Sequence, residues 1–339
     1  MIINRVIVHI INKDSDAPIF NEYEVEINET ISNFLEKHIK KAFKDEKTRK
    51  ANFNPSSKVK EISKKILESG IGFTELSKEI AVNLHSATKD SSESVSSDLI
   101  ICLFDDDEGC KWVGYLSLEY SESYFHDIEV VGDKYKISIK KQETSLPGVN
   151  QKIQKGAFIS YYDAIENLCI LDTKIKDFNK LKSDDNYFIN KFLEARIIFD
   201  DKFYTQILKT ETDNWVKEKI KVDEFDDIEE IREKMHFVLH EEEDVDVDEF
   251  SSDVFKNKLD IKEDYVNNLK SKGLELDKFQ IDKEWVEKKC KNIKIKIDDT
   301  IEVSIPYSEY KDKNKFELIK NNDGTKNIVI KGFYNFYEK

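Results

Sequence analysis

A run of basic side chains between Lys37 and Phe53 is the group of residues in this sequence whose types and spacing best suit a chemical task. The stretch reads KHIKKAFKDEKTRKANF, and seven of its seventeen residues are lysine or arginine. Lysine ammonium groups bind phosphates as point charges, without reading the order of bases. The chemistry that the stretch could perform is therefore contact with the backbone of a polyanion. The alternative is that it forms only the solvated face of a helix.

The overall charge of the chain hides two opposed local charges. The formal net charge of the 339 residues is −15. Residues 36 to 65 contain eleven Lys or Arg against four Asp or Glu, whereas residues 223 to 253 contain fifteen acidic residues against two basic ones. The local balances are thus +7 and −13. Because attraction depends on the field within a Debye length of ~8–10 Å, the net charge does not exclude a nucleic-acid partner.

Two other groups of polar residues could hold a metal, and in each the spacing favours another interpretation. His236 and His240 are four residues apart on a predicted helix beside carboxylates, which would suit zinc. No Glu directly follows the first histidine, as the metalloprotease motif requires, and we interpret the pair as structural. The run DDDEGC, residues 105–110, lacks the twelve-residue spacing of an EF-hand and predicts a hairpin turn. We predict no metal site.

No motif for nucleotide binding or nucleophilic catalysis occurs in the sequence. The Walker A, G-x-G-x-x-G, G-x-S-x-G and H-R-D patterns are absent, and no spacing singles out a catalytic triad. We predict no catalytic residue, no enzymatic activity and no cofactor. No apolar run approaches the ~18 residues of a membrane span, and residues 4–12 alternate like a strand, so we expect no membrane partner.

The basic stretch must be positioned by a helix and by the segment that follows it. Asn28 is a suitable N-cap for a helix that runs to about Lys44, with apolar residues at helical spacing along one side. Phe43 belongs to this apolar seam, which leaves Phe53 as the aromatic side chain that could stack on bases. The segment DEKTRKANFNP is predicted as a loop that ends at Pro55. Four lysines fall within an arc of about 100° opposite the seam: Lys37, Lys40, Lys41 and Lys44.

Periodicity along the remaining chain predicts an α+β fold. Two helices follow, one from PSS to Gly70 and one capped by Thr74. Strands of a largely antiparallel sheet are predicted at DLIICLF, CKWVGYLSLEY, YKISIKK, KGAFISYY and NLCILD. Helical spacing returns over residues 175 to 290, and four short strands close the chain, with a turn at Asn322-Asp323-Gly324.

We expect three segments. Residues 1–172 form a mixed N-terminal module with the basic helix and the antiparallel sheet, residues 173–290 a helical middle with the acidic segment, and residues 291–339 a small C-terminal β element.

The order of these segments resembles the bacterial nucleoid-associated protein family, the 37-kDa nucleoid-associated, NdpA-like proteins. The resemblance rests on RVIVHIINK with INETISNFLEKHIKKAFKDEKTRKANF, on LIICLF, WVGYLSLEY and GAFISYYDAIENLCILD, and on IKIKIDDTIEVSIPYSEYKDKNKFELIKNNDGTKNIVIKGF. It implies a cytoplasmic protein of the bacterial nucleoid that associates with DNA, without enzymatic activity or a cofactor. The basic stretch coincides with the basic segment that follows the first helix in this family.

We therefore predict a non-enzymatic, nucleoid-associated protein that binds double-stranded DNA with little sequence preference. The residues predicted to contact DNA are Lys37, Lys40, Lys41, Lys44, Lys47, Arg49 and Lys50.

Other interpretations stay open at this point. The chain could be a protein-interaction module whose acidic segment, residues 223–253, docks on a DNA-processing enzyme. That segment could also be a solvated helical face, or it could fold over the basic stretch. A metal-dependent hydrolase would need His236 and His240 to converge with carboxylates around an ion. A homodimer would double the basic stripe.

Overall fold

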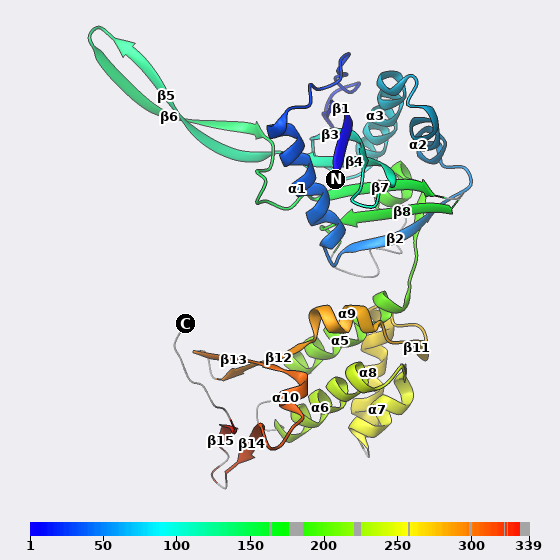
Figure 1. Ribbon diagram of the computed structural model, residues 1–339, viewed down its shortest axis with the longest axis vertical. Coiled ribbons are helices and arrows are strands. Elements are labelled where there is room, and N and C mark those ends of the chain that lie inside the picture. The colour runs from blue at the N-terminus through cyan, green and yellow to red at the C-terminus, as the bar shows by residue number, and fades with distance from the viewer. Residues whose placement is uncertain are drawn as a thin grey trace. The chain divides into compact units, whose positions relative to one another are not determined.

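The computed structural model shows a chain that forms two compact units, Met1–Ile198 and Phe199–Lys339 (Figure 1). The residues that the structure describes are 1–162, 165–175, 186–219, 225–256, 258–297, 300–321, 323 and 325–332. Helices combine with a mostly antiparallel sheet and small C-terminal strands, so the predicted α+β class is confirmed. The expected division into three segments stays a prediction. Among the described helices, none combines the length and the hydropathy that a membrane span requires.

A seven-stranded sheet forms the centre of the first unit, in the order β1-β3-β4-β7-β8-β2-β9. Each neighbouring pair of strands runs antiparallel. The runs predicted at 98–104, 110–120, 155–162 and 167–172 lie on β3, β4, β7 and β8, which confirms a largely antiparallel sheet. The strands are β1 (Ile2–Ile11), β2 (Thr48–Phe53), β3 (Ser97–Asp105), β4 (Lys111–Glu119), β7 (Lys155–Tyr162), β8 (Ile165–Asp172) and β9 (Ala195–Ile197).

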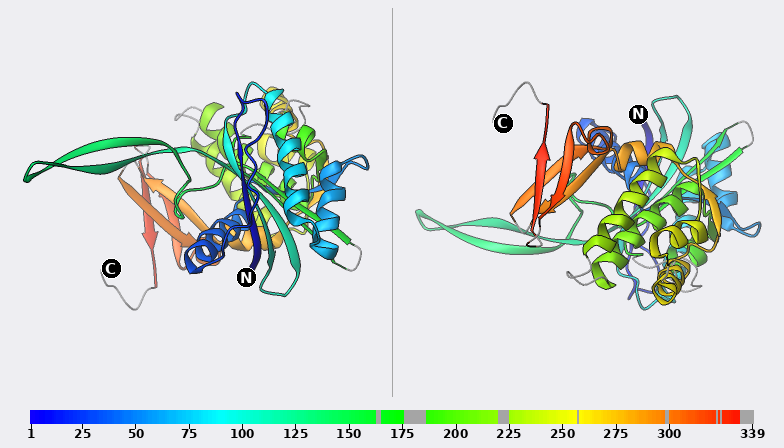
Figure 2. Two further views of the ribbon diagram at one scale, coloured as in Figure 1. Left: turned by 90° about the horizontal axis from the view of Figure 1, so that it is seen from above. Right: turned by 90° about the horizontal axis from the view of Figure 1, so that it is seen from below.

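The central strands are buried on both faces because their side chains alternate between two cores. On β3, Leu99 and Ile101 enter the core shared with α2, α3 and the π-helical turn η1, whereas Ile100 and Cys102 enter the core shared with α1. Figure 2 shows α1 and the α2–α3 pair on opposite sides of the sheet. The elements that cover the sheet are α1 (Glu29–Lys44), α2 (Lys58–Ser69), α3 (Phe73–Lys89) and η1 (Tyr187–Phe192).

Helix α1 has the limits that the sequence predicts. The side chain of Asn28 accepts a hydrogen bond from the backbone N–H of Ile31 at 3.0 Å and caps the first turn. The residues of the apolar seam that lie deepest against the sheet are Leu35, Ile39 and Ala42, each at most 1% exposed. The seam and the lysine-bearing side are therefore opposite sides of one helix.

The next two helices differ in how well their starts are predicted. Helix α2 is capped by Ser57 and ends at Gly70, whose φ of 63° lies in the left-handed region that glycine favours. Helix α3 does not begin at Thr74, so the predicted cap is wrong. It begins at Phe73, which is fully buried, after Gly72 at φ 70°. Burial of the Phe73 ring decides where this helix starts, and no side-chain cap is needed.

The segment after α1 is not the predicted loop. Residues 48–53 form β2, an inner strand that pairs with β8 on one side and with β9 on the other. Ala51 and Phe53 point into the core on the α2–α3 side and are 4% and 6% exposed. Local polarity suggests a loop, but partner strands more than a hundred residues away impose the extended conformation. Phe53 is therefore buried, and the expectation that it could stack on bases is wrong.

The run YKISIKK forms a strand, but not a strand of the central sheet. It lies on β6 (Lys134–Ser145), which pairs with β5 (Ser121–Val131) in a separate two-stranded ribbon. Figures 1 and 2 show this ribbon projecting from the rest of the first unit. Gly132, at φ 62°, and Asp133 form its two-residue turn. The dipeptide Gly-Asp between two alternating runs is the signal that would have predicted the hairpin.

The second unit has a helical core. Its helices surround the buried side chains of Leu208, Trp215, Leu239 and Tyr265. The hydroxyl groups of Tyr265 and Thr212 lie 2.7 Å apart and satisfy each other inside this core. The helices are α5 (Asp201–Lys219), α6 (Phe225–Glu241), α7 (Val247–Phe255), α8 (Leu259–Ser271) and α9 (Lys283–Lys289).

Short strands complete the second unit, and they include the C-terminal strands that the sequence predicts. β12 pairs with β13, β14 pairs with β15, and a ladder of β10 with β11 closes the helical core. Of the predicted turn at 322–324, residues 322 and 324 lie outside the described residues. The elements are β10 (Asp244–Asp246), β11 (Lys278–Gln280), β12 (Asn292–Ile297), β13 (Ile301–Pro306), α10 (Tyr307–Tyr310), β14 (Phe316–Lys320) and β15 (Lys326–Ile330).

His9 on β1 is buried as a neutral imidazole with a defined tautomer. Its Nδ1 accepts the backbone N–H of Asn21 at 3.2 Å, so Nε2 carries the proton and donates to Ser77 Oγ at 2.9 Å. The Ser77 hydroxyl in turn donates to the Thr74 carbonyl at 2.6 Å. Burial, and to a smaller extent the charge of Lys78, lower the pKa of His9 to about 4. A second proton would break the contact with Asn21.

We predict that His9 makes the stability of the first unit depend on pH. Because its folded pKa is below the unfolded value of 6.5, its contribution is present above pH 6.5 and is lost as the pH falls toward 4. His9→Gln should have a lower free energy of unfolding than the wild type at pH 7. This difference in free energy should narrow by on the order of 2 kcal/mol at pH 4. Urea unfolding, monitored by circular dichroism at each pH, measures the difference in free energy of unfolding. Parallel pH profiles of the two proteins would contradict the prediction.

Candidate nucleic-acid interface

The predicted DNA-contacting residues lie on two elements, α1 and β2. The four lysines of α1 face away from Leu35, Ile39 and Ala42, so they form an exposed stripe along the helix, hereafter the α1 stripe. Lys47 lies in the short connection between the two elements. The strand β2 carries Arg49 and Lys50. The structure therefore joins most, but not all, of the seven side chains into one surface.

Arg49 does not lie on this surface. Successive side chains of a strand point to opposite faces of the sheet. Arg49 shares its face with Ala51, on the side of α2 and α3, whereas Lys50 points to the side of α1. The guanidinium of Arg49 also donates a hydrogen bond to the carbonyl of Glu46. Sequence proximity alone places Arg49 with the lysines, and the alternation of β2 separates it from them.

The lysines of the α1 stripe differ in how far their charges are compensated. Lys40 donates to Glu36 Oε1 at 2.6 Å and lies 3.8 Å from a carboxylate oxygen of Asp107. The hydrogen bond with Glu36 raises the pKa of Lys40, and the charge of Asp107 raises it further. Lys37 and Lys44 are exposed and form no ion pair with any residue that the structure describes. Lys40 is thus the member of the stripe whose charge is least available to a ligand.

Two further lysines are held by carbonyl groups. Lys41 Nζ donates to the carbonyl of Val149 at 2.7 Å, and Lys47 Nζ donates to that of Thr173 at 2.5 Å. A carbonyl carries no net charge, so both lysines keep their full positive charge while their positions become restricted. An ammonium group has three N–H donors, which leaves two for a phosphate oxygen.

A carboxylate inside the basic stretch is neutralised by a lysine that the sequence analysis missed. Asp45, directly after α1, accepts a hydrogen bond from Lys152 at 2.8 Å. Burial alone would raise the pKa of Asp45, but the bonds from Lys152 and from the backbone N–H of Lys47 outweigh it and lower the pKa. Asp45 is therefore satisfied by Lys152 and compensates little of the charge on the α1 stripe. Lys152 is 107 residues away in sequence, and no local pattern identifies it.

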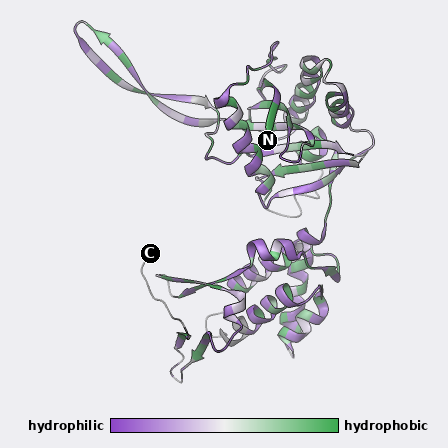
Figure 3. Ribbon diagram, in the orientation of Figure 1, coloured by the Kyte–Doolittle hydropathy of each residue, from purple (hydrophilic) through white to green (hydrophobic). Residues whose placement is uncertain are grey.

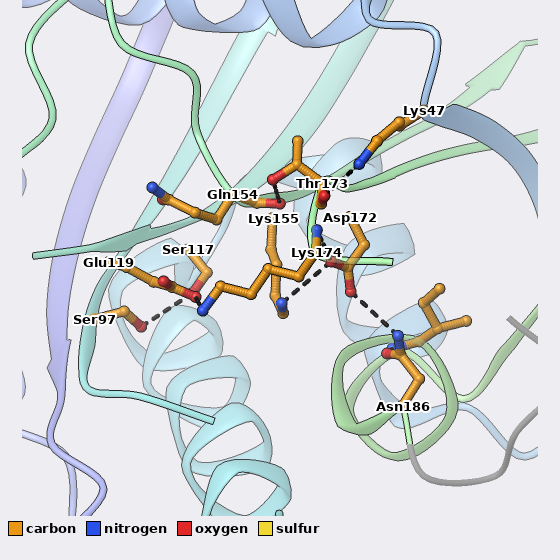
Figure 4. A network of polar contacts seen from close by, with 11 residues as sticks. Lys47, Ser97, Ser117, Glu119, Gln154, Lys155, Asp172, Thr173, Lys174 and Asn186 are labelled. Carbon is orange, nitrogen blue, oxygen red and sulfur yellow. Dashed lines mark hydrogen bonds and ion pairs between the residues drawn. The ribbon is translucent and has the colours of Figure 1, made fainter. Parts of the chain in front are cut away.

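A network of buried polar groups extends from β7 and β8 to Lys47, in the connection between α1 and β2 (Figure 4). Lys155 and Asp172, which have 4% and 3% of their side chains exposed, form an ion pair at 3.2 Å between β7 and β8. The other oxygen of Asp172 accepts a hydrogen bond from Asn186 at 3.2 Å. Thr173 donates its backbone N–H to Gln154 O at 2.9 Å, and its own carbonyl is the group that accepts Lys47. The network thus connects a buried ion pair to the exposed Lys47.

The two histidines of α6 contact aromatic rings and a backbone carbonyl group. His240 Nε2 lies 3.1 Å from the carbonyl of Cys290, and its ring stacks on Tyr307 with centroids 4.0 Å apart. His236 lies beside Tyr310, and burial lowers the pKa of His236 to about 4. Within the described ranges, no group of three or more His, Cys, Asp or Glu is placed to hold a metal ion. The two histidines pack α10 against α6.

The DDDEGC run is the hairpin turn that the sequence predicts. Asp106 Oδ1 accepts the backbone N–H groups of Glu108 and Cys110, each at 2.9 Å, and Oδ2 accepts the Trp112 indole N–H at 2.9 Å. The carboxylate is therefore used by the turn itself.

The acidic segment 223–253 is partly neutralised within its own unit. Residues 223 and 224 lie outside the described part of the chain. Several carboxylates of the segment form ion pairs with lysines of the second unit. The pairs are Glu230–Lys256, Lys234–Asp253, Glu241–Lys311, Asp244–Lys278 and Asp248–Lys262. The segment also contributes Ile231, Leu239 and Phe250 to the buried core. It is an integral part of the fold and not a separate tail.

Comparison with known proteins identifies a family that the chain matches. The model of a protein family described as nucleoid-associated protein YejK matches residues 7–337, nearly the whole chain. No curated protein matches the chain.

We predict that the buried ion pair stabilises the first unit only as a complete pair. Asp172→Asn would leave the ammonium of Lys155 buried without its carboxylate, and we expect it to lower the free energy of unfolding by about 3 kcal/mol. The matched control is Glu68→Gln, which removes an exposed pair with Lys64 and should cost less than about 0.5 kcal/mol. Urea unfolding measures both. Equal effects of the two substitutions would contradict the prediction.

Proposed function

The chain belongs to this family of nucleoid-associated proteins, and on that premise we propose that it binds double-stranded DNA directly, with little sequence preference and without catalysing a reaction. In the cell it would lie in the cytoplasm, on the bacterial nucleoid. The observation that carries the proposal is the α1 stripe, which presents uncompensated positive charge in a chain of net charge −15.

The composition of the stripe favours phosphate contact over base reading. All four of its members are lysines, which act as point charges and lack the planar fork that arginine uses to recognise guanine. Lys37 and Lys44 are two helical turns apart, which is ~10 Å along the helix axis. A duplex presents one phosphate charge per ~1.7 Å of its axis, so each lysine of the stripe can meet a phosphate of its own.

The principal contacts in this proposal are Lys37, Lys41 and Lys44, supported by Lys47 and Lys50. Lys40 contributes less because Glu36 compensates its charge. Arg49 contributes least because it lies on the other face of β2. Neighbouring lysines are therefore expected to contribute unequally to DNA binding. A general effect of positive charge would make their contributions equal.

We predict that the salt dependence of duplex binding reports the stripe. If about four lysines neutralise phosphates, log K should fall with log[salt] at a slope near −3.6. The triple variant Lys37→Gln, Lys41→Gln, Lys44→Gln should flatten the slope by about 2.7, because three contacts are removed. Fluorescence anisotropy with a labelled duplex across a salt series measures both slopes.

The matched control removes the same charge from the other side of the sheet. Lys58, Lys64 and Lys65 are exposed on α2, and their replacement by Gln changes the net charge equally. This control should keep the wild-type slope. If it weakens binding as much as the α1 variant does, or if the wild type does not bind duplex DNA at low salt, direct binding by the stripe is refuted.

A second experiment asks whether DNA binding is independent of the acidic segment, which in the rival function docks on a DNA-processing enzyme. Deleting residues 223–253 would destroy the helical core, because Ile231, Leu239 and Phe250 are buried there. Replacing the exposed Glu242, Glu243 and Glu249 by Gln removes charge and leaves the core intact. We expect this variant to bind DNA with unchanged or slightly higher affinity, measured in the same anisotropy assay. Because carboxylates repel phosphates, loss of DNA binding in this variant would contradict the assignment of the contact to the α1 stripe.

A further inference from the structure

The ribbon formed by β5 and β6, hereafter the hairpin arm (residues 121–145), lacks the support that a two-stranded sheet needs. Among the described strands, β5 and β6 pair with each other alone. Figures 1 and 2 show the ribbon extending away from the body of its unit. An isolated hairpin is at best marginally stable in water, and a third strand or a helix packed on one face is normally required. The arm therefore lacks a covering layer.

The register divides the arm into two unlike faces. Residues opposite each other in an antiparallel pair share a face, and so do residues two apart along a strand. Ile128 lies opposite Ile137, and Val130 lies opposite Tyr135. His126 and Ile139 extend the same face, hereafter the apolar face, toward the base of the arm. Figure 3 shows hydrophobic and hydrophilic stretches alternating along both strands.

The opposite face is charged and already satisfied. Lys136 pairs with Glu129 at 3.1 Å, and Lys140 pairs with Asp127 at 2.5 Å, each across the ribbon. These pairs need no partner beyond solvent. The two faces of the ribbon thus differ: the apolar face exposes a continuous row of large apolar side chains, whereas Phe125 and Val131 on the charged face lie apart from each other.

The exposed apolar area is that of a protein interface. The six largest apolar side chains of this face are between 54% and 78% exposed: Tyr124, Ile128, Val130, Tyr135, Ile137 and Ile139. Together they expose on the order of 700 Å², which exceeds the ~300–600 Å² of the largest patch on a typical monomer. It is close to the ~800 Å² that each partner buries in a complex of standard size.

The charge of the arm argues against a polyanion as its partner. Residues 121–145 contain four lysines and five acidic residues, so the arm has no excess of positive charge. Lys136, Lys140 and Lys141 are also paired with carboxylates of β5. Neither a nucleic acid nor an anionic membrane surface would find the cations it requires. The partner must therefore offer a matching apolar surface without a strong charge.

We propose that this partner is a second copy of the chain, with the apolar faces of two hairpin arms stacked on each other about a two-fold axis. The face meets both requirements by itself, since its outer part is apolar and Lys141, at the base of the arm, is already paired with Glu122. An isologous contact places Ile128 and Ile137 of each copy near the axis. Two such faces would bury on the order of 1,400 Å² in total, within the ~1,200–2,000 Å² range of stable interfaces.

The test is the mass of the full chain in solution, measured without DNA, so that its outcome is independent of the DNA-binding proposal. Sedimentation equilibrium should give a mass of twice 39.8 kDa, with dissociation on dilution. Ile137→Glu places a carboxylate at the centre of the interface twice, once per copy, and should weaken the dimer at least roughly a hundredfold. Circular dichroism should show that its fold is retained.

The matched control is Phe125→Glu. Phe125 is 47% exposed on the charged face, where the new carboxylate would lie opposite Lys140. This variant should dimerise like the wild type. Hydrogen exchange of residues 121–145 gives a second readout, since protection of the arm should fall as the protein is diluted. A monomer at every concentration, a dimer that survives Ile137→Glu, or an arm that stays protected in the monomer would each overturn the proposal.

Discussion

The packing of α1 against the seven-stranded sheet is the contact on which the first unit depends. Leu35, Ile39 and Ala42 insert into one face of the sheet, while α2 and α3 cover the other. With both faces covered, the central strands require apolar residues at successive positions, as on β3. The same contact fixes the rotation of α1 about its axis. Because its apolar seam is buried, helical geometry sends the lysines of the α1 stripe to the opposite, solvated side.

Charge is arranged locally in this protein. In the first unit, Glu36 compensates Lys40 and Lys152 compensates Asp45, which leaves Lys37 and Lys44 without an ion pair among the described side chains. In the second unit, lysines from several elements pair with the acidic segment. The net charge of −15 therefore does not describe the field that a ligand would meet near α1.

The α1 stripe and the hairpin arm belong to the same unit but have different chemistry. The stripe carries charge and suits a polymer of phosphates, whereas the arm carries an apolar face and suits another protein surface. A dimer joined through two arms would present two stripes. Two linked sites of modest strength bind a long polymer more tightly than either does alone, because the second contact is intramolecular. Binding without sequence preference gains most from such doubling.

Much of this architecture was predictable, since residues close in sequence determine helix limits and strand periodicity. Asn28 caps α1 as predicted, α2 begins after the run PSS as predicted, and short apolar runs identify β3, β4, β7 and β8. The strand character of β2, the burial of Phe53 and the pairing of Asp45 with Lys152 depend on segments more than a hundred residues away. The sequence by itself determined the α+β class and the helical stripe of lysines, because both follow from local periodicity. Only the tertiary structure decided which lysines remain uncompensated and which strands leave the sheet, because both depend on partners that local patterns do not specify.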